Sequence, residues 1–299
     1  TLTMTRSKLS YLYAGLAVLF WSTIPTVFKI GLGELEVLTM LSIATFTSTF
    51  VLFIVLVVNK KLHLFAATTS RELLTSILLG LLNPFIYYLI LLKAYTLLPG
   101  QVAQPLNMIW PIIFVFLSVP LLKQKIPGRS FIALFISLAG VYVVSSQGHP
   151  FKPGVSNPLG VLLAAGSSIF WSFYFIFNLR DKRDEAVKLF TNFLFASIYL
   201  LIAMTVTGQW NNISGFKGIT ASVYVGIFEM GITFLFWLKA LQLAETTDRI
   251  CNLVYLAPFL SLIFLHFIIN EPVYYTTPCG LILIITGIVI QNRRTVMAC

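Results

Sequence analysis

Ten long apolar runs, separated by short polar breaks, constrain this chain more than any other feature of its sequence. A helix needs about 20 apolar residues to cross the hydrocarbon core of a bilayer, which is about 30 Å thick. Runs of that length predict membrane-spanning helices over residues 10–32, 35–58, 72–98, 101–122, 129–147, 157–178, 188–207, 219–243, 248–269 and 274–292. The connections between them are too short to hold a soluble domain.

Composition agrees with this interpretation. Hydrophobic residues make up 58% of the chain and charged residues 10%, whereas a soluble domain has about 25% charged residues. The runs are continuously apolar and lack the alternation of a membrane β-strand. The sequence therefore predicts an all-α polytopic membrane protein whose main partner is the lipid bilayer.

The distribution of basic residues predicts the orientation of the chain. If the N-terminus is cytoplasmic, 16 of the 20 Lys and Arg residues fall in or beside cytoplasmic segments, where such residues accumulate. We therefore expect both termini in the cytoplasm and an integral multi-pass protein of the bacterial inner (plasma) membrane. The net charge of +10 is then explained by contact with anionic lipid, and we expect no nucleic-acid partner.

Four short stretches recur in the same order in the two halves of the chain. Phe-Trp-Ser at 20–22 returns at 170–172, "LLKAYTLL" at 91–98 matches "WLKALQLA" at 237–244, Pro111 matches Pro258, and "LAGVYV" at 138–143 matches "ITGIVI" at 285–290. Each half contains five predicted spans, and an odd number inverts the second half in the membrane. The sequence predicts two inverted five-helix repeats, residues 1–147 and 148–299.

Inverted repeats are typical of carriers that work by alternating access, with a solute site near the bilayer midplane where the repeats meet. Exchanging the conformations of the two halves turns an inward-facing cavity into an outward-facing one. We expect the spans 10–32, 72–98, 101–122, 157–178, 219–243 and 248–269 to surround this cavity.

These features together resemble the EamA-type branch of the drug/metabolite transporter superfamily. The resemblance rests on the five-plus-five repeat, on Phe-Trp-Ser in spans one and six, and on "KAYTLLPGQVAQPLNMIWPIIFVFL" over spans three and four. It implies a secondary transporter that exports small organic metabolites. The segment "LNMIWP" is most similar to exporters of amino acids or related compounds; organic cations, drugs and nucleoside derivatives are the alternative solutes, and a channel is a further alternative.

Two polar pairs lie at matching depths in the repeats. Asn83 and Glu229 are 146 residues apart, as are Tyr87 and Thr233 one helical turn later. Polar groups at membrane depth are costly unless they have partners or a function, so all four are candidate substrate-binding residues. The alternative is that Asn83 and Glu229 only join neighbouring helices.

Glu229 is also the candidate for proton coupling, since it is the one carboxylate well within the hydrocarbon depth. Such a group can bind a proton or pair with a solute ammonium, although a permanently protonated structural role is equally compatible with the sequence. Lys93 departs from the positive-inside pattern, and we expect it to bind a solute carboxylate at the mouth of the cavity.

Aromatic and amide side chains complete the predicted site. Tryptophan is usual at membrane interfaces, but three tryptophans fall near mid-span, where they can line a chamber, pack between helices or face lipid. The further candidate substrate-binding residues are Trp21, Asn107, Trp110, Trp171, Asn252 and Tyr255.

The spans 129–147 and 274–292 carry small residues among aliphatic ones, which suits close helix packing or the face of a homodimer. The sequence contains no His-Glu-x-x-His or Gly-x-Ser-x-Gly motif, and its three cysteines have neither metal-ligand nor disulfide spacing. We expect no enzymatic activity, no catalytic residue, no metal and no cofactor; the expected partner besides lipid is a small-molecule solute.

Overall fold

The computed structural model describes residues 6–123, 128–152, 156–244, 250 and 253–292, and within these ranges every regular element is helical. The longer helices are α1 (Arg6–Leu32), α2 (Val37–Val58), α3 (Leu62–Ala66), α4 (Ser70–Gly80), α5 (Tyr87–Leu97), α6 (Gly100–Asn107), α7 (Trp110–Leu122), α8 (Arg129–Ser145), α9 (Pro158–Arg180), α10 (Glu185–Thr207), α11 (Phe216–Tyr224), α12 (Ile232–Leu243), α14 (Ala257–Ile269) and α15 (Thr276–Asn292). Short turns complete them: η1 (Leu81–Ile86), η2 (Gln209–Asn212), η3 (Val225–Glu229) and η4 (Val254–Leu256).

Seven helical segments of the described chain are long and apolar enough to cross a membrane. They are Arg6–Leu32, Val37–Val58, Ser70–Leu97, Gly100–Leu121, Pro158–Arg180, Glu185–Thr207 and Phe216–Leu243. Three shorter apolar helices, Arg129–Ser145, Val254–Ile269 and Thr276–Ile290, lie where the remaining spans are predicted. The prediction of an all-helical polytopic protein is confirmed; ten spans in two inverted repeats stay a prediction.

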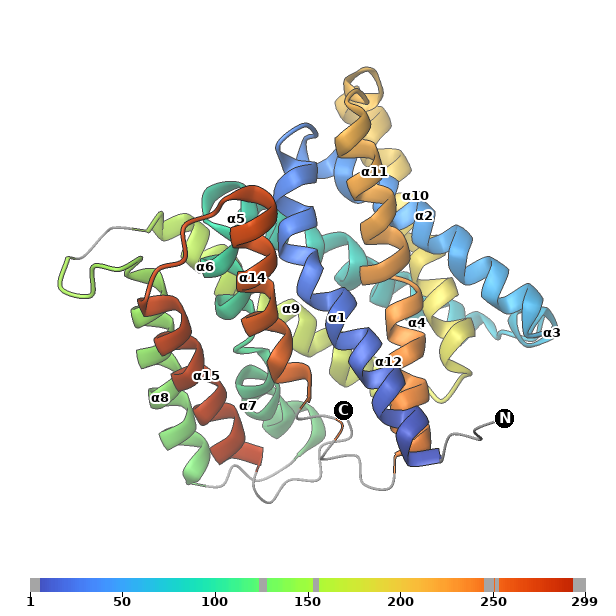
Figure 1. The fold of residues 1–299 in the computed structure, drawn as a ribbon. Helices are drawn as coiled ribbons and strands as arrows, with labels where there is room; N and C mark the ends of the chain where they lie inside the picture. The colour runs from blue at the N-terminus through green and yellow to red at the C-terminus, as the bar shows by residue number, and fades with distance from the viewer. Residues whose placement is uncertain (1–5, 124–127, 153–155, 245–249, 251–252, 293–299) are drawn as a thin grey trace.

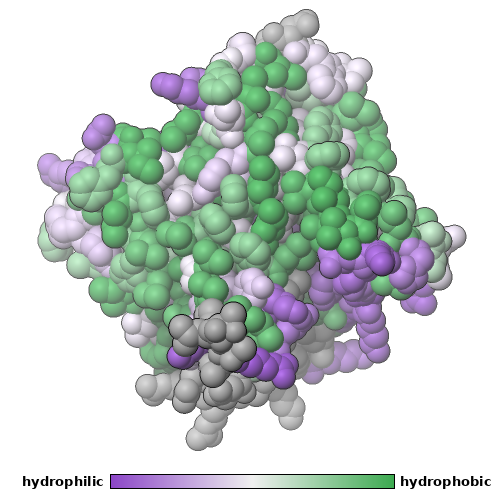
Figure 2. Space-filling model, turned by 45° about the vertical axis from the view of Figure 1, so that its right-hand side comes forward, coloured by the Kyte–Doolittle hydropathy of each residue, from purple (hydrophilic) through white to green (hydrophobic). Residues whose placement is uncertain are grey.

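The outer surface of the bundle is apolar. Figure 2 shows hydrophobic side chains over most of the visible face, with hydrophilic ones gathered mainly toward its lower edge. Large side chains such as Phe50, Phe135 and Phe267 are 64%, 70% and 77% exposed. Such a surface is suited to contact with lipid tails, which surround a membrane protein as water surrounds a soluble domain.

Helices from distant parts of the sequence pack side by side. α8 lies along α15 and α2 along α10; α1 contacts α12 and α14, while α9 contacts α5 and α7. In Figure 1, α8 and α15 stand together at the left edge of the bundle. α1 begins and α15 ends at the lower end of that view, which we call the terminal end; the other is the opposite end.

Small residues allow the closest helix contacts. A Cβ atom at Gly140 would lie 2.6 Å from the carbonyl oxygen of Gly280, so only glycine fits where α8 meets α15. The small residues of these two helices therefore serve packing within the chain, one of the two alternatives that the sequence leaves open. A Cβ at Gly80 would likewise overlap the carbonyl oxygen of Asn192, and one at Gly226 that of Ala44.

Two predicted spans are broken at mid-length. Between α4 and α5, Asn83 has non-helical backbone angles (φ −145°, ψ 124°) just before Pro84, which has no N–H to donate. Between α11 and α12, Gly231 departs from helical angles (φ −116°, ψ −99°). The hydroxyl of Ser48 on α2 donates to the carbonyl of Met230 at this break (2.9 Å). The predicted spans over 72–98 and 219–243 are therefore present but interrupted at these two points.

Candidate functional site

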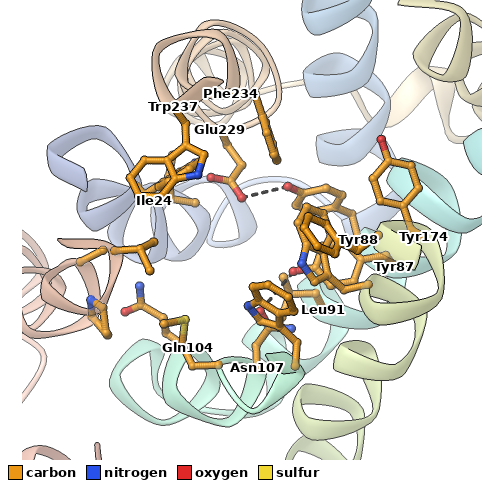
Figure 3. A pocket seen from close by; sticks show the side chains of 18 of the residues that line it. Ile24, Tyr87, Tyr88, Leu91, Gln104, Asn107, Tyr174, Glu229, Phe234 and Trp237 are labelled. Atoms are coloured by element: carbon orange, nitrogen blue, oxygen red, sulfur yellow. Dashed lines mark hydrogen bonds between the residues drawn. The ribbon is translucent and has the colours of Figure 1, made fainter. Parts of the chain in front are cut away.

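A cavity of about 290 Å³ lies at the centre of the bundle. Its lining comes from α1, α5, α6, α7, α9, α10, α12, α14 and the turns η3 and η4 (Figure 3). The six spans expected to surround a cavity all contribute, and α10 adds Glu185 and Leu189. No described residue of α2, α8 or α15 lines it. We call this cavity the chamber.

Glu229 is the acidic group at the centre of the chamber. It ends η3 beside the break in its span, and its side chain is half-buried. The hydroxyl of Tyr88, which is 2% exposed, donates to Oε1 of Glu229 at 2.8 Å. Figure 3 shows this bond crossing the chamber from the α5 side to the turn that holds Glu229. A carboxylate held in this way keeps a fixed position while its second oxygen is left for a ligand.

A second polar chain starts from the residue next to Tyr88. The Tyr87 hydroxyl donates to Oδ1 of Asn107 (3.1 Å), and Nδ2 of Asn107 donates to the hydroxyl of Ser167 on α9 (2.8 Å). The rings of Tyr87 and Tyr88 pack edge-on with centroids 4.7 Å apart. Neighbouring tyrosines of α5 thus orient polar groups on two sides of the chamber.

Aromatic rings form much of the remaining wall. Trp21 lies 5.4 Å from Trp237 and 5.8 Å from Phe234 between ring centroids. Trp171 lies 5.0 Å from Tyr87 and 6.1 Å from Phe234. The tryptophans of the two Phe-Trp-Ser copies therefore both contact one phenylalanine, and the repeated tripeptide contributes twice to the wall of one chamber.

The chamber brings together seven of the eleven residues that the sequence singles out. Those that line it are Trp21, Tyr87, Asn107, Trp110, Trp171, Glu229 and Tyr255. Asn83 and Thr233 are buried and do not line it. Lys93 is exposed and does not line the chamber, and Asn252 lies outside the described residues.

The broken helices explain these differences. The expected placement of Asn83 and Thr233 assumes an unbroken helix, in which residues four apart share a face. Because the chain leaves the helix at Asn83 and Gly231, that relation fails. Tyr88 and Phe234 line the chamber instead. They are 146 residues apart, so the offset between the two halves could have identified them as a pair from the sequence.

Other lining residues lie outside the eleven candidates, although the sequence already predicts by its spacing that Gln104 can face the chamber. Gln104, Tyr174 and Trp237 all face the chamber. The Tyr174 hydroxyl is buried, without a partner that meets hydrogen-bond geometry, beside the side chains of Asn83 and Asn192. Gln104 follows Gln101 and precedes Asn107 at three-residue spacing, and this spacing is the signal that marks its helix face.

Charged contacts close the opposite end of the bundle. Nζ of Lys29, in the last turn of α1, donates to the carbonyls of Tyr95 (3.0 Å) and Leu98 (3.1 Å) where α5 ends. The Glu271 carboxylate accepts from the backbone N–H groups of Gly100 (3.0 Å) and Gln101 (2.9 Å) where α6 begins. Each charge meets the helix end of opposite partial charge.

The chamber extends instead toward the terminal end. Its lining there includes Asn178 and Glu185, and the Glu185 side chain is 43% exposed. Nearby, Arg183 pairs with Asp181 (2.5 Å) and donates to the hydroxyl of Ser76 (2.7 Å). Burial opposes the charged form of Asp181, but the hydrogen bonds from Arg183 outweigh it and hold the pKa of Asp181 below its ordinary value.

Similar proteins identify the family of this chain. Residues 8–146 and 158–293 match the EamA-like transporter family. An uncharacterized transporter of Clostridium kluyveri is 27% identical over 78% of this chain and 75% of its own length. The uncharacterized transporter YvbV of Bacillus subtilis is 23% identical over 72% of this chain and 70% of its own.

Two further similarities span almost the whole chain. An uncharacterized transporter of Archaeoglobus fulgidus is 21% identical over 95% of this chain and 99% of its own length. A crystal structure covering 96% of this chain and 97% of its own superposes with a TM-score of 0.65 at 20% identity, which supports the fold. The family match covers both halves of an all-helical, lipid-facing bundle. The chain is an integral membrane transporter and belongs to the EamA-like transporter family.

Proposed function

We propose that this protein is a secondary transporter that exports small amine-bearing organic solutes, with amino acids and related compounds among them, by alternating access through the chamber. The observation that carries the proposal is the position of Glu229. Its carboxylate faces a central chamber lined by helices of both halves and is held there by Tyr88. A carboxylate in that position can pair with the ammonium group of a solute.

The packing of the helices supports two inverted repeats of five spans, residues 1–147 and 148–299. When each span is exchanged with its counterpart five places along, the pair α1–α12 becomes α9–α5 and the pair α1–α14 becomes α9–α7. The pairs α2–α10 and α8–α15 are each exchanged with themselves. The close approaches also correspond, since Gly80 meets Asn192 where Gly226 meets Ala44.

Broken spans at equivalent positions also support a site between the repeats. Asn83 and Glu229, 146 residues apart, each stand at the interruption of a membrane span. Interrupted helices at matching places in two halves are typical of solute sites in secondary transporters. Polar groups that lose their helical hydrogen bonds at a break can bind the solute or rearrange when the protein changes conformation.

The distribution of basic residues supports a cytoplasmic terminal end, in a bacterial inner membrane. The chamber then extends toward the cytoplasm, while Lys29 and Glu271 close the periplasmic side. An exporter loads its solute from this inward-facing state. Glu229 also serves the return step in our proposal, because a proton and a solute ammonium compete for the same carboxylate.

Counterflow in proteoliposomes tests the proposal. Vesicles loaded with an unlabelled solute should take up the same solute in labelled form, saturably and transiently above equilibrium. Such overshoot requires a carrier that exposes its site alternately, and a channel does not produce it. Saturable uptake without overshoot would contradict alternating access, and uptake equal to that of empty liposomes would contradict transport of the solutes tested.

A further inference from the structure

We infer that the chamber selects solutes that carry one ammonium group and no anionic group, attached to an apolar body. The inference rests on the proposed function and narrows its solute class from amine-bearing compounds in general to organic monocations. Zwitterions such as free amino acids would bind more weakly than amines that carry the same apolar group.

The charges at the chamber carry the first step of the argument. Among the described residues that line it, the formally charged side chains are Glu229 and Glu185, both acidic. No described Lys, Arg or His lines the chamber. A solute carboxylate would therefore enter a region of low polarity that offers it negative charge and no counter-charge, which is unfavourable.

The basic residues close to the chamber are already committed or turned away. Lys29 donates to two backbone carbonyls at the closed end, and Lys188 pairs with Glu185 (2.7 Å) and contacts the carbonyl of Asn178. Lys93 and Lys239 are exposed. The N-terminal ends of α7 and α12, which begin at Trp110 and Ile232, offer only partial positive charges.

The aromatic wall carries the second step. A cation is attracted to the face of an aromatic ring within about 6 Å of its centroid, most strongly to tryptophan. Trp21, Trp171 and Trp237 all line the chamber that contains Glu229, and Phe234 contacts the first two. Ring faces and one carboxylate together favour an ammonium, whereas the electron-rich faces of the rings disfavour an anion.

The position of the carboxylate carries the third step. Tyr88 occupies Oε1 of Glu229, and in Figure 3 the second oxygen is turned toward the side of the chamber where Trp237 lies. An ammonium bound to this oxygen would lie among the rings. The space of about 290 Å³ is ample for an apolar body of the size of an aromatic side chain, since a cavity of about 150 Å³ already holds benzene.

Matched solutes test the inference directly. Dissociation constants at neutral pH are measured on purified full-length protein, by quenching of tryptophan fluorescence, for 2-phenylethylamine, phenylalanine, 3-phenylpropionate and 2-phenylethanol. A second set uses 3-methylbutylamine and leucine. We expect at least one amine to bind saturably and at least tenfold more tightly than every other solute of its body. If neither amine binds more tightly than its zwitterion, the inference is overturned.

Variants test the role of the carboxylate and the role of the aromatic wall separately. Glu229→Gln should remove the preference for the amine, whereas Glu36→Gln, at an exposed glutamate that makes no cap hydrogen bond, should keep it. Trp171→Leu should weaken amine binding several-fold more than Trp171→Phe, which keeps a ring; this pair decides the matter if Glu229→Gln does not fold. Equal effects of the two Trp171 variants together with retained preference in Glu229→Gln would contradict the inference.

Counterflow measured with the same solutes distinguishes a failure of the selectivity inference from a failure of the proposed transport function. Phenylalanine or leucine exchanged at least as well as the amines would leave transport intact and overturn the inference. Selective amine binding without counterflow of any solute would overturn the proposed transport and leave the selectivity of the chamber established.

Discussion

The hydroxyl of Tyr88 lies 2.8 Å from Oε1 of Glu229 and joins α5 of the first half to η3 of the second. This bond fixes the carboxylate that is proposed to meet the solute. Tyr88→Phe removes one hydrogen bond to a charged group, worth about 1.5–3 kcal/mol. We expect kcat/KM for transport to fall by about tenfold or more, with the folded yield retained.

The matched control for Tyr88→Phe is Tyr142→Phe. Tyr142 is exposed on α8, away from the chamber, and donates to the carbonyl of Pro150 (2.7 Å). It loses a hydroxyl of the same kind, so transport should be unchanged. Equal effects of the two substitutions would show that the Tyr88 bond has no special part in transport.

The two equivalent glycine contacts predict matched losses of stability. Ala at Gly80 or Gly226 places a Cβ against a backbone carbonyl of the neighbouring helix, and overpacking of this kind costs about 1–3 kcal/mol. Both variants should lower the unfolding midpoint in detergent. Gly15→Ala is the control, because a Cβ there meets nothing within 4 Å; a midpoint lowered equally in all three would contradict the packing argument.

Much of the fold is predictable from the sequence because its signal is long and redundant. Each span needs only about 20 apolar residues to be recognised, and repeat offsets near 150 pair Trp21 with Trp171 on sequence grounds alone. The two tryptophans do line the same chamber, and both contact Phe234. The position of these two tryptophans at one cavity is therefore predictable from the repeat.

The face that a side chain presents is less predictable where helices are irregular. Continuous helical periodicity places Thr233 and Asn83 on the face of the chamber, and the breaks beside them turn their side chains out of it. For Lys93, the sequence predicts the depth but not the face of α5, and the side chain is exposed. Contacts such as Glu271 with Gly100 join a loop to the start of α6, 171 residues away in the sequence, and no local pattern encodes such a contact.

The contact of Lys29 with α5 predicts a conformational effect. Lys29→Met removes two charge-assisted hydrogen bonds to the carbonyls of Tyr95 and Leu98, so the outward-facing state should gain population. A Leu91→Cys probe in the chamber, in a background without native cysteines, should react about tenfold faster with an impermeant thiol reagent from the periplasmic side, as a shift of about 1.4 kcal/mol gives.

Lys93→Met is the control for this experiment, since Lys93 is exposed on α5 and should not alter the labelling rate. Labelling that is as slow in Lys29→Met as in the unsubstituted background would mean that Lys29 does not hold closed the opposite end of the bundle, which is proposed to face the periplasm.

The ion pair of Asp181 and Arg183 predicts a dependence of stability on pH. Since Arg183 holds the pKa of Asp181 below its ordinary value, the pair stabilises the fold above that value, and the contribution is lost as the pH falls below about 4. Asp181→Asn should lower the free energy of unfolding by about 1–3 kcal/mol at neutral pH and reduce the acid sensitivity. Lys61→Gln, which breaks a more exposed pair with Asp184, should cost less than about 1 kcal/mol.

A smaller loss of stability for Asp181→Asn than for Lys61→Gln would contradict this ranking of the two ion pairs. The measurement is the unfolding midpoint in detergent over a pH series, which reports the two substitutions on the same scale.

The measurement that tests the central claim most directly is counterflow by Glu229→Gln in proteoliposomes across a series from about pH 5.5 to 8.5, beside Glu36→Gln and the unsubstituted protein. Removing a charge that pairs with the solute ammonium costs about 2 kcal/mol or more, so transport of an amine solute should fall about thirtyfold or more. The remaining activity of Glu229→Gln should no longer vary with pH, and its folded yield should be similar to that of the unsubstituted protein. Transport by Glu229→Gln at the unsubstituted rate, with an unchanged pH profile, would contradict the claim that the solute and the proton meet at this carboxylate.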